Sequence, residues 1–389
     1  MKKPLVFRLA GALAVIIMGA GRAEPVSAKQ AAQKEPGKSE RPSAAPKPAN
    51  PGPRGKAAIA ALAAALQDGD TDADVRQRCA LALGTLGPYA TEAIPALTKA
   101  LKDSATSVRR SAALAIGRIG PAAKEAVPAL AKALGDPDEG VRQAGAFSLG
   151  MMGPAAKEAV PALTAMLQAS RGEVRQVAAG ALGAIGPAAK EATAALGKAL
   201  QDADDGVRLV AARALGGIGP AARQAVPALS AVLTDDNEEV RAAAAYALGE
   251  IGADARAAVP ALIKALADED VDVRAEAAGA LAAIGPAARP AVPTLRKMLK
   301  DENAAAREAA AYALGDLRAR AQPVIQALIA ALEDKEESVR EAVAYALGEI
   351  GPPAAAALPA LRKALADNVE EVKSAAREAI EKIRAAKKP

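Results

Sequence analysis

Few side chains in this sequence could carry out covalent chemistry. Its 389 residues include no histidine, no tryptophan and one cysteine, Cys79. Histidine is the commonest acid–base group and metal ligand in proteins, and one thiol cannot form an intrachain disulfide or a multi-cysteine zinc site. The sequence has no phosphate-binding loop, nucleophile elbow or paired catalytic carboxylates. We therefore expect no catalytic residue, cofactor or metal site, and a protein that is not an enzyme.

The residues best suited to non-covalent recognition share one recurring position. Tyr246, Tyr312 and Tyr345, three of the four tyrosines, each lie five residues after an arginine that returns throughout the chain. Acidic residues gather around them: Glu250, Glu276, Glu308, Asp316, Glu341 and Glu349. Tyrosine offers a large contact area at low entropic cost and is enriched at binding hot spots. The pattern predicts an acidic, tyrosine-lined surface that receives a basic or extended segment of a protein partner.

The corresponding positions in the N-terminal half are neutral to basic and include Arg110, Leu114, Phe147 and Met151. The predicted protein-binding residues are Tyr246, Tyr312, Tyr345, Glu250, Glu308, Asp316, Glu341, Glu349, Phe147 and Arg110. A simpler interpretation stays open, in which these are solvated helix faces and the tyrosines merely pack over alanine.

The arginine that defines these positions returns every 33 residues, at Arg76, Arg109, Arg142, Arg175, Arg208, Arg241, Arg274, Arg307 and Arg340, with Lys373 as the last copy. One copy reads VRAAAAYALGEIG from Val240. Its Val240, Ala244, Leu248 and Ile251 fall within roughly 80° of one another on an α-helix and predict the buried side. A fixed period over ten copies is typical of stacked helical repeats.

Each unit also has a first helix, exemplified by PAAKEAVPALAKAL from Pro121. A further proline recurs inside it at Pro95, Pro128, Pro161, Pro227, Pro260, Pro293 and Pro359. Proline within a helix removes a backbone hydrogen bond, so we expect one bent helix in nearly every unit. The unit that begins at Ala319 lacks the Gly-Pro start and has Gln326 at the proline position, which predicts a change of pitch there.

Units of the form L-x-D-x5-R, followed by AAxALGxIG and a proline-containing apolar helix, resemble HEAT repeats, in particular the short bacterial type also seen in phycobilin lyases. The resemblance covers Lys56 to about Lys388 and implies an all-α, right-handed α-solenoid of ten 33-residue helical pairs. It also implies a structural ladder of turn aspartates and helix arginines: Asp103–Arg109, Asp136–Arg142, Asp202–Arg208, Asp235–Arg241, Asp268–Arg274, Asp301–Arg307 and Asp334–Arg340. Ala169 replaces the aspartate of the fourth unit, which predicts a softer joint.

In HEAT stacks the second helices line the concave face, so the resemblance implies a non-catalytic scaffold that binds a protein partner in its concave groove. It leaves one alternative, a lyase-like or chaperone-like accessory protein of the phycobilin-lyase type, although such a protein is expected in the cytoplasm. A HEAT-like iron hydroxylase would need histidine–glutamate pairs, which a histidine-free chain lacks.

Three segments are expected along the chain. Residues 1–28 have the pattern of a bacterial export signal, with Lys2 and Lys3 before the apolar run Leu9–Ala20 and small residues that end at Ala23 or Ala28. Residues 29–55 are rich in proline, alanine and lysine and predict a disordered linker, and residues 56–389 are the solenoid. We expect a periplasmic or secreted protein, monomeric and without a membrane span once the signal is removed. The alternative is a signal retained as an anchor.

The basic isoelectric point of 9.2 originates in the N-terminal segments. Residues 56–389 contain 40 basic and 42 acidic residues, so the predicted solenoid is nearly neutral. Affinity for nucleic acid depends mainly on neutralising phosphates, and the sequence lacks the interleaved basic and aromatic residues of single-strand binders. We therefore expect no nucleic-acid partner.

Overall fold

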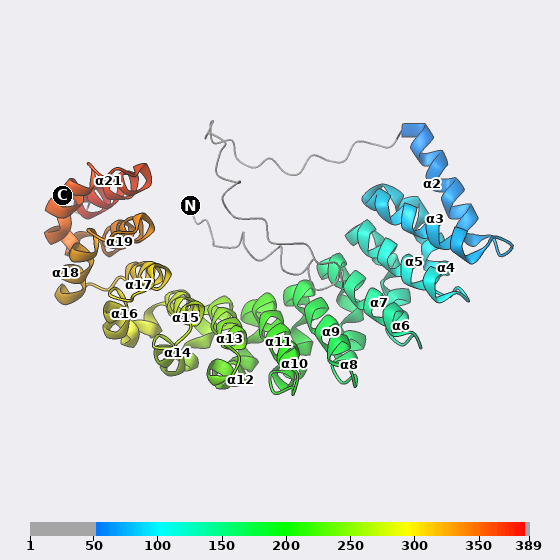
Figure 1. Ribbon diagram of the computed structural model, residues 1–389, viewed down its shortest axis with the longest axis horizontal. Coiled ribbons are helices and arrows are strands. Elements are labelled where there is room, and N and C mark those ends of the chain that lie inside the picture. The colour runs from blue at the N-terminus through cyan, green and yellow to red at the C-terminus, as the bar shows by residue number, and fades with distance from the viewer. Residues whose placement is uncertain (1–51, 386–389) are drawn as a thin grey trace. The chain divides into compact units, whose positions relative to one another are not determined.

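The computed structural model describes residues 52–385, which form ten helix pairs. The pairs follow one another in a curved row, with the second helix of each pair along its inner side (Figure 1). The predicted all-α solenoid is confirmed. No helix within residues 52–385 has the length and apolar character needed to cross a membrane. The predicted signal, residues 1–28, and most of the predicted linker lie outside the described residues.

The second helices have nearly constant lengths. They are α3 (Ala73–Leu86), α5 (Thr106–Ile119), α7 (Glu139–Met152), α9 (Gly172–Ile185), α11 (Asp205–Ile218), α13 (Glu238–Ile251), α15 (Val271–Ile284), α17 (Ala304–Asp316), α19 (Glu337–Ile350) and α21 (Glu370–Ala385). Several begin with a side-chain cap, as where Asp138 accepts from the backbone N–H of Val141. Eight end at a glycine with φ between 54° and 77°, a region that L-residues rarely adopt, which explains the recurring final glycine of the motif.

The first helices differ from the expected single bent helix. The first pair begins with α2 (Gly52–Gln67), which starts four residues before the predicted array boundary at Lys56. Most later units have a 3₁₀ segment followed by a short α-helix: η2 (Gly87–Ala93) and α4 (Ile94–Ala100), η3 (Gly120–Ala126) and α6 (Val127–Ala133), η4 (Gly153–Ala159) and α8 (Val160–Met166), η5 (Gly186–Ala192) and α10 (Thr193–Ala199), η6 (Gly219–Ala225) and α12 (Val226–Ala231) with η7 (Val232–Thr234), η8 (Gly252–Ala258) and α14 (Val259–Ala265), η9 (Gly285–Ala291) and α16 (Val292–Met298), and η10 (Pro352–Ala357) and α20 (Leu358–Ala364).

The recurring proline therefore occupies the first turn of a new helix, where its missing N–H costs little, as Pro128 does in α6. Proline is not the only cause of the break. Ala194 stands at the proline position of α10, and the boundary between η5 and α10 is unchanged. The 3₁₀ segment instead accompanies the glycine with positive φ, and it is missing in the one later unit that lacks this glycine.

That exceptional unit contains α18 (Gln322–Ala331), a single short helix. Arg318 occupies the glycine position and has φ 48°. The N–H of Arg318 donates to the carbonyl of Gly315 at 2.8 Å, and that of Ala319 donates to Leu314 at 3.0 Å. These two bonds form a Schellman ending of α17 with an arginine where glycine is usual. The unit for which a change of pitch was predicted is thus the one that lacks a 3₁₀ segment, and the change of pitch itself stays a prediction.

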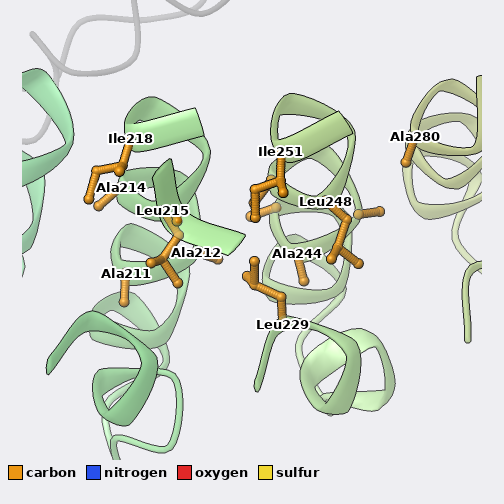
Figure 2. Close-up of a cluster of buried hydrophobic side chains, with 14 of the residues drawn as sticks. Ala211, Ala212, Ala214, Leu215, Ile218, Leu229, Ala244, Leu248, Ile251 and Ala280 are labelled. Atoms are coloured by element: carbon orange, nitrogen blue, oxygen red, sulfur yellow. The ribbon is translucent and has the colours of Figure 1, made fainter. Parts of the chain in front are cut away.

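The core is a continuous layer of small and branched side chains between the helices. The predicted buried side of α13 is confirmed, because Val240, Ala244, Leu248 and Ile251 are at most 1% exposed. Figure 2 shows this layer where side chains of α11 and α13 meet Leu229 of α12. Neighbouring second helices approach closely, since a Cβ atom added to Gly183 would lie 2.7 Å from the Cα of Ala214. Alanine and glycine therefore set the spacing of the array.

A ladder of arginines and aspartates joins consecutive units, but its pairing differs from the expected one. Arg109 does not bind the side chain of Asp103. Its Nε and Nη2 donate to the carboxylate of Asp136, 27 residues ahead, at 2.8 and 2.9 Å. Its Nη1 donates to the backbone carbonyl of Asp103 at 2.9 Å. The guanidinium reaches forward because it projects from the start of one second helix towards the turn before the next, and it thereby links two turns.

The same two-bond forward pairing joins Arg76 to Asp103, Arg175 to Asp202, Arg208 to Asp235, Arg241 to Asp268, Arg307 to Asp334 and Arg340 to Asp367. Arg76, Arg175 and Asp367 are thus members that the expected pairing omitted. The Arg109 guanidinium lowers the pKa of Asp136, and Asp136 in turn raises the pKa of Arg109. Both side chains are nearly buried, at 13% and 10% exposure, so the pair is shielded from solvent.

Two rungs are incomplete. The aspartate that Arg142 would meet is replaced by Ala169, so Arg142 bonds only the backbone carbonyls of Asp136 and Pro137, at 2.8 and 3.0 Å. Arg175, in the same unit as Ala169, still pairs with Asp202. The joint between the third and fourth units therefore lacks the arginine–aspartate pair, and the softer joint stays a prediction. Arg274 makes one bond to Asp301, at 2.9 Å, and its buried Nε has no partner within the described residues.

Replacing Ala169 with aspartate should complete the missing rung. The new carboxylate would accept from Arg142 and raise the free energy of unfolding by about 1–2 kcal/mol, as charge-assisted hydrogen bonds do. Urea unfolding measures this change, with Ala169→Asn as a matched variant that keeps the shape without the charge. The pKa of Asp136, which forms the preceding rung, is lowered in the folded protein, and we expect the same for the new carboxylate. The gain in unfolding free energy should therefore be present above the ordinary aspartate pKa of 3.8 and lost as the pH falls through the lowered pKa. Equal effects of Asp and Asn at pH 7 would contradict the forward pairing.

Candidate functional site

The candidate site lies on the second helices α13 to α19, along the inner side of the row (Figure 1). We define the tyrosine–acidic face as Tyr246, Glu250, Glu276, Glu308, Tyr312, Asp316, Glu341, Tyr345 and Glu349. The three tyrosines are half-buried, as are Glu276, Glu308, Glu341 and Glu349, whereas Glu250 and Asp316 are exposed. The face is formed by side chains whose backbone positions are fixed by the 33-residue register.

The C-terminal part of the face is a contact cluster. The rings of Tyr312 and Tyr345 lie 5.4 Å apart between centroids and are tilted by 58°. The hydroxyl of Tyr345 donates to Oδ1 of Asp316 at 3.0 Å. Lys382 borders the cluster, with its Nζ 5.7 Å from the centre of the Tyr345 ring and 2.9 Å from Glu349. The two rings thus form a rigid aromatic platform between carboxylates.

The hydroxyl groups of Tyr312 and Tyr345 both have a pKa above the ordinary tyrosine value. Burial, followed by the charges of Glu341 and Glu308, raises the pKa of Tyr312 to about 12. Burial, followed by the hydrogen bond to Asp316 and the charges of Asp316 and Glu349, raises the pKa of Tyr345 above its ordinary value. The tyrosines therefore remain neutral hydrogen-bonding groups around neutral pH.

Tyr246 lies apart from the other two tyrosines, because Gly279 occupies the equivalent position in the intervening helix α15. Its ring packs over α11, so that a Cβ atom added to Gly216 would lie 3.2 Å from Cε1 of Tyr246. Burial, followed by the charges of Glu250 and Glu276, raises its pKa. Tyr246 is thus closely packed in an acidic environment. The structure brings the rings of Tyr312 and Tyr345 together, and Tyr246 stands apart from them.

The carboxylates of this face repel one another. Burial raises the pKa of Glu276, and the charges of Asp272 and Glu250 raise it further. Burial also raises the pKa of Glu341, together with the charges of Glu371, Glu308 and Glu337. Within residues 52–385 no lysine or arginine forms an ion pair with Glu250, Glu276, Glu308, Asp316 or Glu341. The face is therefore electrostatically suited to a positively charged ligand.

Glu276 belongs to the predicted acidic surroundings of the tyrosines but not to the predicted protein-binding residues, and in the structure burial raises its pKa. It lies two residues after Arg274, beside the predicted stripe, and its partial burial required knowledge of how α13 and α15 pack.

The N-terminal residues of the predicted site form no comparable cluster. Arg110 of α5 is exposed, and Phe147 of α7 is half-buried. Met151 of α7 is 44% exposed and Leu114 of α5 is half-buried. Cys79 is buried at the repeat position that Ala244 holds in α13. Among the described residues, no group of three or more acidic or cysteine side chains is arranged to hold a metal ion.

A family model for HEAT repeats matches the chain in overlapping segments: residues 59–150, 94–183, 127–216, 193–259, 259–323 and 293–381. Together these segments span residues 59–381, well over half of the chain. No curated protein matches the chain.

Several solved structures share the fold. An engineered protein is 26% identical, with a TM-score of 0.55, and the match covers 84% of this chain and 99% of that one. Yeast importin-β (Kap95p) is 17% identical with a TM-score of 0.59, and a complex of Kap95 with Nup1 is 18% identical with a TM-score of 0.58. These matches cover 86% and 85% of this chain, which spans about half of the importin-β chain, 52% in both cases.

Replacing Glu276 with glutamine should stabilise the protein at neutral pH. Because the folded-state pKa of Glu276 is raised, ionisation opposes folding once the pH rises through that pKa. The thermal midpoint of Glu276→Gln should therefore exceed that of the original protein at pH 7, and the difference should shrink below the ordinary value of 4.5. The exposed residue Glu158 provides a control, since Glu158→Gln should show no such pH-dependent gain. A lower midpoint for Glu276→Gln at pH 7 would show that its carboxylate is not electrostatically strained.

Proposed function

Because this chain belongs to the family of HEAT-repeat proteins, we propose that it is a non-catalytic scaffold that holds a partner protein against its tyrosine–acidic face. The observation that carries the proposal is a row of half-buried carboxylates, those of Glu276, Glu308 and Glu341, which have no ion pair within residues 52–385 and lie near the tyrosines. Such an arrangement lowers stability in isolation, and a bound cation would relieve its repulsion.

The chemistry of the face defines the partner. Carboxylates on α13, α15, α17 and α19 are repeated along the row, so they suit a segment that carries several lysine or arginine residues in an extended conformation. The tilted rings of Tyr312 and Tyr345 offer contact to apolar stems and cation–π contact to charged ends. We expect the affinity to fall with salt, because much of the attraction acts between partly exposed charges.

The structural neighbours support a scaffold role at the level of the fold. One of them is Kap95 in complex with Nup1, so an array of this architecture can hold another protein. The identity of 18% limits this argument to the fold, and the partner of the present chain is inferred from its own residues. We propose that one chain, as a monomer, provides the whole binding face.

We propose further that the protein is exported to the periplasm or secreted, on the basis of the charged start, apolar run and small residues within residues 1–28. Expression of the full chain in a bacterial host, followed by fractionation and N-terminal sequencing, tests this proposal. The expected product lies outside the cytoplasm and begins at Glu24 or Lys29. A cytoplasmic product that retains residues 1–28 would refute export without affecting the binding proposal.

A labelled 16-residue peptide of alternating lysine and serine provides a defined test of binding. The full chain should bind it, and a glutamate–serine peptide of equal length should not bind. Combined replacement of Tyr312 and Tyr345 by alanine should weaken binding about tenfold or more, as expected for hot-spot aromatic residues. Glu276→Gln and Glu341→Gln should also weaken it, whereas Glu158→Gln, which removes a charge from an exposed position elsewhere, should have little effect.

Fluorescence anisotropy at two salt concentrations measures these affinities, and circular dichroism confirms that each variant is folded. If the lysine–serine peptide bound all variants equally, the site would lie elsewhere on the array. If it did not bind at all, the proposed chemistry of the partner would be wrong.

A further inference from the structure

A hollow of about 570 Å³ lies beside the end of α19. Its lining comes from the turn before α18, the end of α19, the start of η10 and the last helix, α21: Arg318, Arg320, Gly348, Glu349, Ile350, Gly351, Pro352, Pro353 and Lys382. Three of these side chains are basic and one is acidic. Charge of this sign distinguishes the hollow from the neighbouring tyrosine–acidic face.

The hollow follows from the break in the repeat. Elsewhere the 3₁₀ segments of consecutive units contact one another, from η2 to η6 and from η6 through η8 to η9. The unit between η9 and η10 has no 3₁₀ segment, and η10 contacts the helix α18 instead. Arg318 and Arg320 stand where other units have the glycine and the second residue after it, so two long cationic side chains lie at the interruption.

The backbone at Arg318 is unfavourable for an arginine. Its φ of 48° makes it the one non-glycine residue with positive φ in the described part of the chain, and glycine holds this position in eight other units. A left-handed conformation is unfavourable for an L-residue, whereas glycine adopts it readily. Local strain of this kind clusters at functional sites, and here it lies at a residue that lines the hollow.

The charges define the ligand. Lys382 is paired with Glu349 at 2.9 Å, which leaves Arg318 and Arg320, both exposed and without an ion pair within residues 52–385. Two free guanidiniums match a doubly charged oxyanion better than a single carboxylate, and phosphate carries about 1.5 to 2 negative charges at neutral pH. We propose that this hollow is a phosphate-binding site, occupied by free phosphate or by the phosphate group of an ester.

This site borders the proposed protein-binding face and shares Glu349 with it, but its proposed ligand contacts, Arg318 and Arg320, are not part of that face. Arg318 and Arg320 hold the oxyanion between two planar donors, and Lys382 adds a third positive charge that Glu349 partly offsets. The two proposals can therefore fail separately.

Thermal unfolding of the full chain tests the site with inorganic phosphate as the ligand and sodium chloride of equal ionic strength as the reference. Phosphate should raise the melting midpoint in a saturable manner, and chloride should not. A second series with glycerol 3-phosphate distinguishes the source. Stabilisation by both compounds indicates that the hollow accepts a phosphate ester, and stabilisation by phosphate alone indicates a site for the free anion.

Two variants separate binding from stability. Arg318→Gly should raise the melting midpoint without phosphate, because it removes the strained φ, and should lose most of the response to phosphate. Arg320→Ala should lose the response with little change in the phosphate-free midpoint. Arg223→Ala, at an exposed arginine of η6, should keep the full response. Equal stabilisation by phosphate and chloride, or an undiminished response in both Arg318→Gly and Arg320→Ala, would overturn the proposal.

Discussion

The forward pairing of the recurring arginine with the aspartate of the next unit, made by every copy except Arg142, is the constraint on which the structure depends. One guanidinium binds the carbonyl of its own turn and the carboxylate of the following turn, as Arg109 does with Asp103 and Asp136. Small residues, including Gly183, then allow the second helices to pack closely. The ladder and the close packing together repeat the same geometry every 33 residues, so side chains at one position of the motif fall into a row. Tyr312 and Tyr345 are in contact for this reason, although 33 residues separate them.

Departures from the repeat are informative because each has a local physical consequence. Ala169 leaves Arg142 without a carboxylate, and Arg274 has an unpartnered Nε. The loss of the glycine at Arg318 removes a 3₁₀ segment and opens a basic hollow. The acidic face, in contrast, arises on second helices that keep the regular register, through substitutions at solvent-facing positions. The regular motif thus builds the support, and the variable and irregular positions carry the features that could recognise other molecules.

Much of the fold could be predicted from the sequence. The spacing of Val240, Ala244, Leu248 and Ile251 places them on one side of a helix, and that side is buried in the structure. The direction of the ladder could not be predicted, because Arg109 has one candidate six residues before it, Asp103, and another 27 residues after it, Asp136, and only the three-dimensional placement of the turns selects one. The split first helix was also missed, because proline suggested a kink whereas Ala194 shows that the break persists without it. At the site, the shared position in the repeat predicted that tyrosines would align, but not the ring contact of Tyr312 with Tyr345 or the enclosure of Glu276.

The central claim is that one part of a uniform scaffold has acquired a cation-binding surface. Hydrogen exchange measured by mass spectrometry, on the full chain with and without the lysine–serine peptide, tests it most directly. Binding at the tyrosine–acidic face should slow exchange only in α13 through α19 and leave α3 through α9 unchanged. Protection that is uniform along the array, or strongest in α3 through α9, would contradict it.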